Sequence, residues 1–296
     1  MVVGRLRRYS SWLWLLPAVM LVVVFVYYPV VDNIRLSFFS WNAFAPREKW
    51  VGLDNYANLL ADPVFWTALF NNVAYAVVSI VVQVGGGLVL AAILEEVVRG
   101  RWKGFFRVVF FIPATISLTV TGLLFQFLYN PQIGLIDQLL VWLGHPELAH
   151  AWIGEEKTAI WGIIAMSQWQ STGYVMVLFI VAMQKIPREL YEAAYIDGAS
   201  RRQAFLRITV PLVREMSILM LIITISGAFL VFSEVQVMTA GGPNNASHTL
   251  GTWLYKNAFF NDQMGYAAAI GTVIFVITFA IAIIQLWWNR GKQVEY

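Results

Sequence analysis

The sequence contains no cysteine, only three histidines and few charged residues. The absence of cysteine excludes disulfides and thiolate metal sites. Charged residues make up 12% of the 296 residues and hydrophobic residues 59%, whereas a soluble domain carries about 25% charged residues. Because so few charges cannot cover a water-facing surface with polar groups, we expect most of the chain to face lipid.

A phosphate-binding loop of the form G-x-x-x-x-G-K-[ST] is also missing, so the chain is not expected to hydrolyse ATP by that route. A membrane enzyme with a metal site has weak support. His145, Glu147 and His150 stand close together, but they do not form H-E-x-x-H, and their spacing puts the two histidines on different helix faces. We therefore predict a non-catalytic chain without a metal site.

The N-terminal region carries three arginines, Arg5, Arg7 and Arg8, before an apolar run from Trp12 to Val31. The apolar part of a signal peptide spans about 7–15 residues and ends at small residues. This run is longer and ends at two tyrosines and Pro29, so it predicts an uncleaved membrane helix.

Six segments are long and apolar enough to cross a bilayer as helices, which need about 20 apolar residues. The fold class is therefore predicted as all-α: a polytopic membrane protein with six transmembrane helices forming one domain over residues 1–296. Three consecutive glycines at 85–87 favour close helix packing over a hinge. The predicted spans are 12–31, 67–94, 105–129, 158–184, 215–238 and 266–288.

The basic residues predict the orientation of these spans. Of the 20 Lys and Arg, 15 lie before span one, after span six, or in the two loops that follow spans two and four. By the positive-inside rule that side is the cytoplasm, so both termini are expected there. The residues concerned are Arg5, Arg7, Arg8, Arg99, Arg101, Lys103, Arg107, Lys185, Arg188, Arg201, Arg202, Arg207, Arg214, Arg290 and Lys292.

The cytoplasmic segment 187–211 is polar and has clear helix signals. Pro187 suits the first position of a helix, and Gly198 suits a left-handed helix end. Ser200 and Gln203 have the spacing of a capping box, and Pro211 is expected to break the second helix. The pattern predicts two short helices joined at Gly198 on the cytoplasmic face.

Two interpretations of this segment remain open. A basic amphipathic hairpin rests on anionic lipid, and a docking knob fits into a groove of a cytoplasmic partner. The small residues Ala193, Ala194 and Gly198 favour docking, because adhesion to lipid prefers large apolar anchors on that face.

The same segment resembles the EAA motif of permease subunits of bacterial ABC importers, whose core is E-A-A, three residues, then G. Here it is Glu192-Ala193-Ala194 followed by Gly198, and the later I-x-L-P element is present as Ile208 to Pro211 with Val in place of Leu. Two further regions resemble the carbohydrate-uptake branch, which includes the maltose and glycerol-phosphate transporter permeases. They are Met238 to Ala269, and the set Tyr28-Pro29, Ser37-Phe38-Phe39, Trp41-Asn42 and Val51 to Tyr56.

This resemblance implies a permease subunit in the bacterial cytoplasmic membrane, with segment 187–211 as a coupling helix seated in an ATPase subunit. Its expected partners are a second, different permease subunit, two copies of the ATPase subunit, an extracytoplasmic solute-binding protein and membrane lipid, but no nucleic acid. ATP and Mg would be bound by the ATPase subunits, so no cofactor is expected on this chain. The coupling residues implied are Glu192, Ala193, Ala194, Asp197, Gly198 and Ala199.

Polar residues in span four suggest a solute site. Ser167, Gln170, Ser171 and Tyr174 share one helix face and resemble the sugar-contacting places of the maltose permease. Helix–helix hydrogen bonding explains the same residues equally well. In span five, Thr224, Gly227, Ala228 and Val231 fall at comparable places and also share one face.

Two further features belong to the same hypothesis. Glu234 is the only acidic residue well inside a predicted span, and an intramembrane carboxylate is a functional candidate; a position near the interface or in a subunit contact is the alternative. The turn Gly241, Gly242 and Pro243 is interpreted as an outer loop facing the solute-binding protein.

The predicted function is ATP-driven import of a sugar, in particular a di- or oligosaccharide, delivered by a binding protein. The alternative solutes are glycerol-3-phosphate and other polyols. An ion-coupled secondary transporter is a further alternative, although it usually needs several buried carboxylates and often an inverted repeat, and neither is visible in this sequence.

Overall fold

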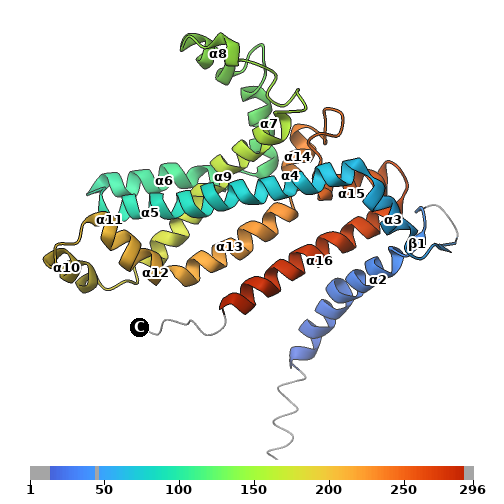
Figure 1. Ribbon diagram of the computed structural model, residues 1–296, viewed down its shortest axis with the longest axis horizontal. Helices are drawn as coiled ribbons and strands as arrows, with labels where there is room; N and C mark the ends of the chain where they lie inside the picture. The colour runs from blue at the N-terminus through green and yellow to red at the C-terminus, as the bar shows by residue number, and fades with distance from the viewer. Residues whose placement is uncertain (1–13, 44–46, 290–296) are drawn as a thin grey trace, which may run out of the picture. The chain divides into compact units, whose positions relative to one another are not determined.

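The computed structural model describes residues 14–43 and 47–289, and in these ranges the chain is almost entirely helical (Figure 1). Five of the basic residues used to predict the orientation lie outside the described residues: Arg5, Arg7, Arg8, Arg290 and Lys292. The elements are η1 (Val23–Tyr27), α2 (Tyr28–Leu36), β1 (Phe39–Ser40), β2 (Lys49–Trp50), α3 (Asp54–Ala61), α4 (Pro63–Ser79), η2 (Ile80–Gly86), α5 (Gly87–Glu96), α6 (Arg101–Thr115), α7 (Leu118–Leu128), α8 (Leu135–Trp142), η3 (Pro146–Leu148), α9 (Ala159–Met183), α10 (Arg188–Ile196), α11 (Arg201–Ala204), η4 (Phe205–Thr209), α12 (Val210–Leu212), α13 (Arg214–Phe229), α14 (Ser233–Met238), α15 (Leu250–Phe259) and α16 (Met264–Asn289).

Four helices are long and apolar enough to cross a membrane: Trp14–Leu36, Pro63–Glu96, Ala159–Met183 and Met264–Trp287. Two further pairs pass the same test of length and composition but are bent, α6 with α7 by 98° and α11–α12 with α13 by 69°. Counted with each bent pair as one span, the described chain has the six predicted spans.

The third predicted span, 105–129, is not one straight helix. It breaks between α6 and α7 at Ile116 and Ser117, whose backbones are extended. Thr115 and Ile116 are β-branched and lower the helix propensity locally. The break is then stabilised from a distant part of the chain, because Gln170 Nε2 donates a hydrogen bond of 2.8 Å to the Ile116 carbonyl.

The fifth predicted span, 215–238, also ends early, at Phe229. The buried Asn72 donates a hydrogen bond of 2.6 Å to the Ala228 carbonyl, and Thr249 Oγ1 donates one of 2.8 Å to the Val231 carbonyl. These side chains pair the carbonyls that a helix end leaves free. Residues 233–238 therefore form a separate helix, α14, and Glu234 lies on it.

The chain divides into two units, each described here by itself. The first comprises residues up to Asp62 together with Leu254–Phe275. In it Asn33 Nδ2 donates to the Ala268 carbonyl (3.1 Å) and to Thr272 Oγ1 (3.2 Å), which joins α2 to α16. The antiparallel strands β1 and β2 pair Phe39 with Trp50.

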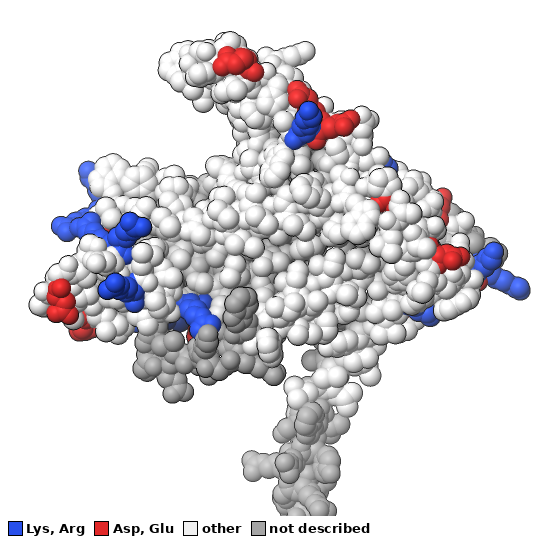
Figure 2. Space-filling view, in the orientation of Figure 1, with Lys and Arg blue, Asp and Glu red and all other residues white. Residues whose placement is uncertain are grey.

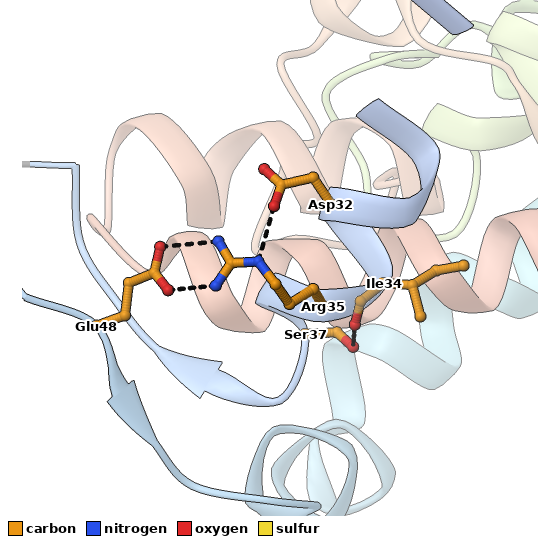
Figure 3. A network of polar contacts seen from close by, with 5 residues as sticks. All are labelled: Asp32, Ile34, Arg35, Ser37 and Glu48. Atoms are coloured by element: carbon orange, nitrogen blue, oxygen red, sulfur yellow. Dashed lines mark hydrogen bonds and ion pairs between the residues drawn. The ribbon is translucent and has the colours of Figure 1, made fainter. Parts of the chain in front are cut away.

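An ion-pair network holds this small hairpin of the first unit (Figure 3). Arg35 Nε contacts Asp32 at 2.8 Å, and its two terminal nitrogens contact the Glu48 carboxylate at 2.5 and 3.0 Å. Because the two contacts to Glu48 are parallel, the pair has the bidentate geometry that strengthens arginine–carboxylate bonds. The hydrogen bonds from Arg35 lower the pKa of Glu48.

The second unit comprises Pro63–Trp253 and Val276–Tyr296 and is built around α9. α9 packs on α5, η2 and α6, and α13 packs on α4 (Figure 1). The core includes the buried side chains of Met176, Phe179 and Met220. A Cβ on Gly87 would lie 3.2 Å from Val175 Cγ1, so one of the three glycines serves the close packing predicted from the sequence.

Candidate functional site

A cavity of about 290 Å³ lies inside the second unit, between α4–η2, α9 and the end of α13. It brings together eight of the nine residues predicted to bind solute, from spans that are far apart in the sequence. These eight are Ser167, Ser171, Tyr174, Thr224, Gly227, Ala228, Val231 and Glu234.

Gln170 does not line the cavity. Its side chain is buried and bonds the Ile116 carbonyl at the α6–α7 break. The four residues predicted to share one face of α9 therefore have two different roles. Ser167, Ser171 and Tyr174 border the cavity, whereas Gln170 stabilises the break between α6 and α7. For Gln170 the structure supplies the helix–helix hydrogen bonding that the sequence left as an alternative.

The cavity wall also contains residues of α4 and η2 that sequence reasoning missed: Tyr75, Ser79 and Gln83. All three are buried, and they recur every four residues. Polar residues at that spacing in an apolar segment share one helix face. This spacing was a signal in the sequence, but the apolar length of span two obscured it.

Glu234 lies on the cavity wall in the first turn of α14, 6% exposed. Tyr75 Oη donates a hydrogen bond of 2.8 Å to its Oε1. Within the described chain the carboxylate therefore has a hydrogen-bond partner from α4. The interfacial position and the subunit contact that the sequence left open stay alternatives. Among the described residues that line the cavity, Glu234 is the only charged one.

The predicted coupling segment forms two short helices, α10 and α11, with Gly198 between them at φ +81°. The capping box is present: Gln203 N donates to Ser200 Oγ (3.3 Å) and Ser200 N donates to Gln203 Oε1 (2.7 Å). The expected break at Pro211 is wrong. The π-helical turn η4 runs directly into α12, and Pro211 lies at the start of α12. The chain bends two residues later, at Val213.

The surface of this segment carries a concavity of about 310 Å³. Ala194, Asp197, Gly198 and Ala199 line it together with residues of α11 and η4. Glu192 and Ala193 are exposed on α10, and Glu192 makes no hydrogen bond or ion pair within the described part of the chain. The six predicted coupling residues therefore lie on one short segment, with their polar groups accessible.

The segment packs against the membrane helices of the same unit, because Tyr191, Phe205 and Ile208 lie against the buried core formed by α5, α9 and α13. Tyr191 Oη and Thr209 Oγ1 are 2.9 Å apart, which joins α10 to η4. Glu95 at the end of α5 contacts Lys103 Nζ at 2.5 Å and also pairs with Arg107 of α6. Figure 2 shows Lys and Arg gathered at the end of this unit that carries α10 and α11, whereas its middle is nearly free of charge.

The turn predicted to face a binding protein is partly buried. Gly241 has φ +86°, and a Cβ there would lie 2.0 Å from the His248 ring, so only glycine fits. Gly242 and Pro243 are half-buried, and Ser247 Oγ donates a 2.5 Å hydrogen bond to the Gly242 carbonyl. The next residue, Asn244, is exposed, and its Nδ2 donates a hydrogen bond of 2.6 Å to Glu156 Oε1.

The histidines considered as metal ligands do not converge. His145 contacts Glu147 at 3.0 Å on the surface, whereas His150 Nδ1 is bonded to the Leu148 carbonyl at 2.7 Å and its ring packs on Trp152. In the described ranges of the chain, no group of three His, Cys, Asp or Glu side chains is placed to hold a metal ion.

A family model described as "Binding-protein-dependent transport system inner membrane component" matches residues 83–294, which include the coupling segment and all the cavity-lining residues except Tyr75 and Ser79. The chain belongs to this family. It is 51% identical, over 97% of its length and 98% of the relative, to the probable ABC transporter permease protein YurN of Bacillus subtilis. It is 30% identical, over 98% of both chains, to the multiple sugar-binding transport system permease protein MsmF of Streptococcus mutans.

Solved structures show the same fold for this family member. A chain of a bacterial ABC transporter involved in the import of the acidic polysaccharide alginate aligns with a TM-score of 0.84 at 21% identity, over 96% of both chains. A chain of a bacterial alginate ABC transporter in complex with alginate pentasaccharide-bound periplasmic protein aligns with a TM-score of 0.83 at 20% identity, over 96% of this chain and 95% of that chain.

Proposed function

We propose that the chain is a permease subunit of an ATP-driven importer that moves a sugar, in particular a di- or oligosaccharide, across the bacterial cytoplasmic membrane. The observation that carries this proposal is the cavity, which lies between membrane-spanning helices and is lined by Ser167, Ser171, Thr224 and Tyr174. Hydroxyl groups match the hydroxyls of a sugar, and an aromatic face packs on its ring. Relatives named for transport of sugars support the same solute class.

The exposed coupling segment supports ATP-dependent operation. A short, rigid pair of helices with small residues at its tip fits a groove, and the free Glu192 carboxylate offers a charge-assisted bond to a basic group of a partner. We assign Glu192, Ala193, Ala194, Asp197, Gly198 and Ala199 to contact with an ATPase subunit. ATP and Mg are bound by two copies of that subunit.

The remaining partners follow from the same proposal. A second, different permease subunit completes the passage, and an extracytoplasmic binding protein delivers the solute to the outer loops, including Gly241, Gly242 and Pro243. We also assign the coupling segment and both termini to the cytoplasm, because the positive-inside rule applied to the Lys and Arg of the sequence favours that side.

Uptake by the complete complex in proteoliposomes tests this function. Labelled solute carried by the binding protein should enter only when ATP is supplied inside the vesicles. An ATPase subunit disabled in hydrolysis should abolish uptake, because the passage then has no source of energy. An ionophore that dissipates the ion gradient should leave uptake unchanged.

The opposite result identifies the ion-coupled alternative: uptake would survive the disabled ATPase subunit and collapse with the ionophore. A panel containing maltose, longer oligosaccharides, glycerol-3-phosphate and a polyol distinguishes the solutes. Preference for glycerol-3-phosphate would contradict the proposed sugar.

A further inference from the structure

Among the described residues that line the cavity there is one carboxylate and no Lys or Arg to compensate its charge. Within the described chain Glu234 is in no salt bridge, and its partner Tyr75 is a neutral hydroxyl. Glu234 lies in the first turn of α14, where the helix dipole favours a carboxylate, but this helix has only six residues. Burying a carboxylate without a cation is costly in a low-dielectric interior, so its place on a cavity wall calls for an explanation.

Two explanations are available from the contacts. Glu234 is either an anchor, whose oxygen holds Tyr75 and so joins α4 to α14, or a charge that acts on whatever enters the cavity. An anchor needs only a hydrogen-bond acceptor, which a glutamine also supplies. The position favours the second explanation, because the side chain borders the same space as Ser167, Ser171 and Thr224.

We propose that Glu234 sets the charge preference of this cavity, so that a sugar carrying a protonated amine is held better than a neutral sugar, and a neutral sugar better than an anionic one. The inference rests on the proposed function, since it names the charge class of the solute at the same site. A cationic group pairs with the Glu234 carboxylate, which has a hydrogen-bond donor but no cation beside it in the described chain. An anion meets a like charge, with no Lys or Arg among the described lining residues to offset it.

The lack of cysteine allows a direct measurement of this field. Ser171→Cys places a single thiol of this chain on the cavity wall. In the complete complex, the thiol is reacted with trimethylammonium-ethyl or sulfonatoethyl methanethiosulfonate, and the labelled subunit is quantified by intact mass. The rate of reaction with the cationic reagent is divided by the rate with the anionic reagent, and this ratio is normalised to the same ratio for a free thiol. The normalised ratio reports the local electrostatic potential, including any charge contributed by the second permease subunit.

The normalised ratio should be well above one in the Ser171→Cys parent and should fall about tenfold when Glu234→Gln is added, because one charge at cavity distances acts oppositely on the two reagents. The matched control is Asp137→Asn. Asp137 is also a buried carboxylate with an aromatic donor, Trp152 Nε1 at 2.7 Å, but it does not line the cavity. Its ratio should match that of the parent.

An unchanged ratio in Glu234→Gln overturns the proposal and leaves the anchor explanation. If the Glu234→Gln variant does not assemble, the Ser171→Cys parent still tests the proposal. A normalised ratio at or below one in that parent would contradict a negative potential in the cavity. Tyr75→Phe provides a second check: it removes the hydrogen bond but keeps the charge, so the ratio should stay as high as in the parent.

Binding of the β-1,4-linked disaccharides of glucosamine, glucose and glucuronate to the complex then tests the solute class, because the three differ in charge but share the same ring and linkage. The glucosamine disaccharide should bind at least about tenfold more tightly than the glucuronate disaccharide, and Glu234→Gln should remove this difference. Equal affinities for the three overturn the charge preference while leaving sugar import intact. Absence of binding by all three, with the thiol ratio as expected, would instead contradict the proposed sugar function.

Discussion

At the scale of single residues, Gly173 sets the distance between two membrane helices. A Cβ built on it would lie 1.7 Å from the Phe110 carbonyl oxygen, so backbone of α6 contacts backbone of α9 directly. Gly173→Ala should therefore force these helices apart and lower the free energy of unfolding by about 1–3 kcal/mol, the usual cost of overpacking. Denaturation of the purified protein in detergent measures this loss.

Gly104→Ala is the matched control for that substitution. Gly104 is also a helical glycine, in α6, but a Cβ there meets nothing within 4 Å. Alanine is the better helix former by about 1 kcal/mol, so this variant should be as stable as the parent or slightly more stable. Equal stability of the two variants would contradict the close helix contact at Gly173.

At the scale of elements, the hairpin of the first unit should respond to pH through Glu48. Its pKa is lowered by the hydrogen bonds from Arg35, so the folded carboxylate binds a proton less readily than the unfolded one. The contribution to stability is then fully present above the ordinary glutamate pKa of 4.5 and is lost as pH falls below it through the lowered pKa.

Hydrogen exchange at Val51, whose amide bonds the Phe38 carbonyl at 3.0 Å, reports this loss. Its protection should weaken as the medium is acidified below pH 4.5. In Glu48→Gln the charge is absent at every pH, so protection should be lower at neutral pH and should not change on acidification. An identical acid response in the two proteins would show that another group is responsible.

The elements also show what the sequence can and cannot predict. Spans such as α9 follow from hydrophobic length alone, and the capping box at Ser200 follows from local chemistry. The breaks at Ile116 and after Phe229 do not, because each is stabilised by hydrogen bonds from side chains of other elements. The break at Ile116 is stabilised by Gln170, 54 positions away along the chain. The break after Phe229 is stabilised by Asn72, 156 positions from its partner Ala228, and by Thr249, 18 positions from its partner Val231.

The residues of the candidate site also differ in whether the sequence alone predicts them. The solute residues of α9 and α13 were predicted from helix periodicity and from resemblance, and the cavity brings most of them together. Gln170 has the right spacing but bonds the Ile116 carbonyl, which is free to accept this bond because the helix breaks between α6 and α7. Tyr75 belongs to the wall because α4 packs beside α13, a tertiary contact that no local pattern specifies.

At the scale of the whole molecule, the proposed function requires that motion of partner ATPase subunits reach the cavity through the coupling segment. Gly198 is the left-handed residue that ends α10, at φ +81°, with open space around its missing side chain. A β-branched residue is strongly disfavoured at such a φ. Gly198→Val should therefore reshape the tip of the segment and abolish ATP-driven uptake, although membrane insertion and assembly of the spans remain intact.

Gly144→Val separates a specific effect on coupling from general strain. Gly144 also follows a surface helix, α8, in a left-handed conformation at φ +86°, and nothing lies within 4 Å of its Cβ position. The two substitutions therefore introduce the same backbone strain in equally open surroundings. If coupling runs through the α10–α11 turn, uptake by proteoliposomes should survive Gly144→Val and fail in Gly198→Val at equal levels of inserted protein. Equal uptake by both variants would exclude the α10–α11 turn from the path between ATP hydrolysis and solute movement.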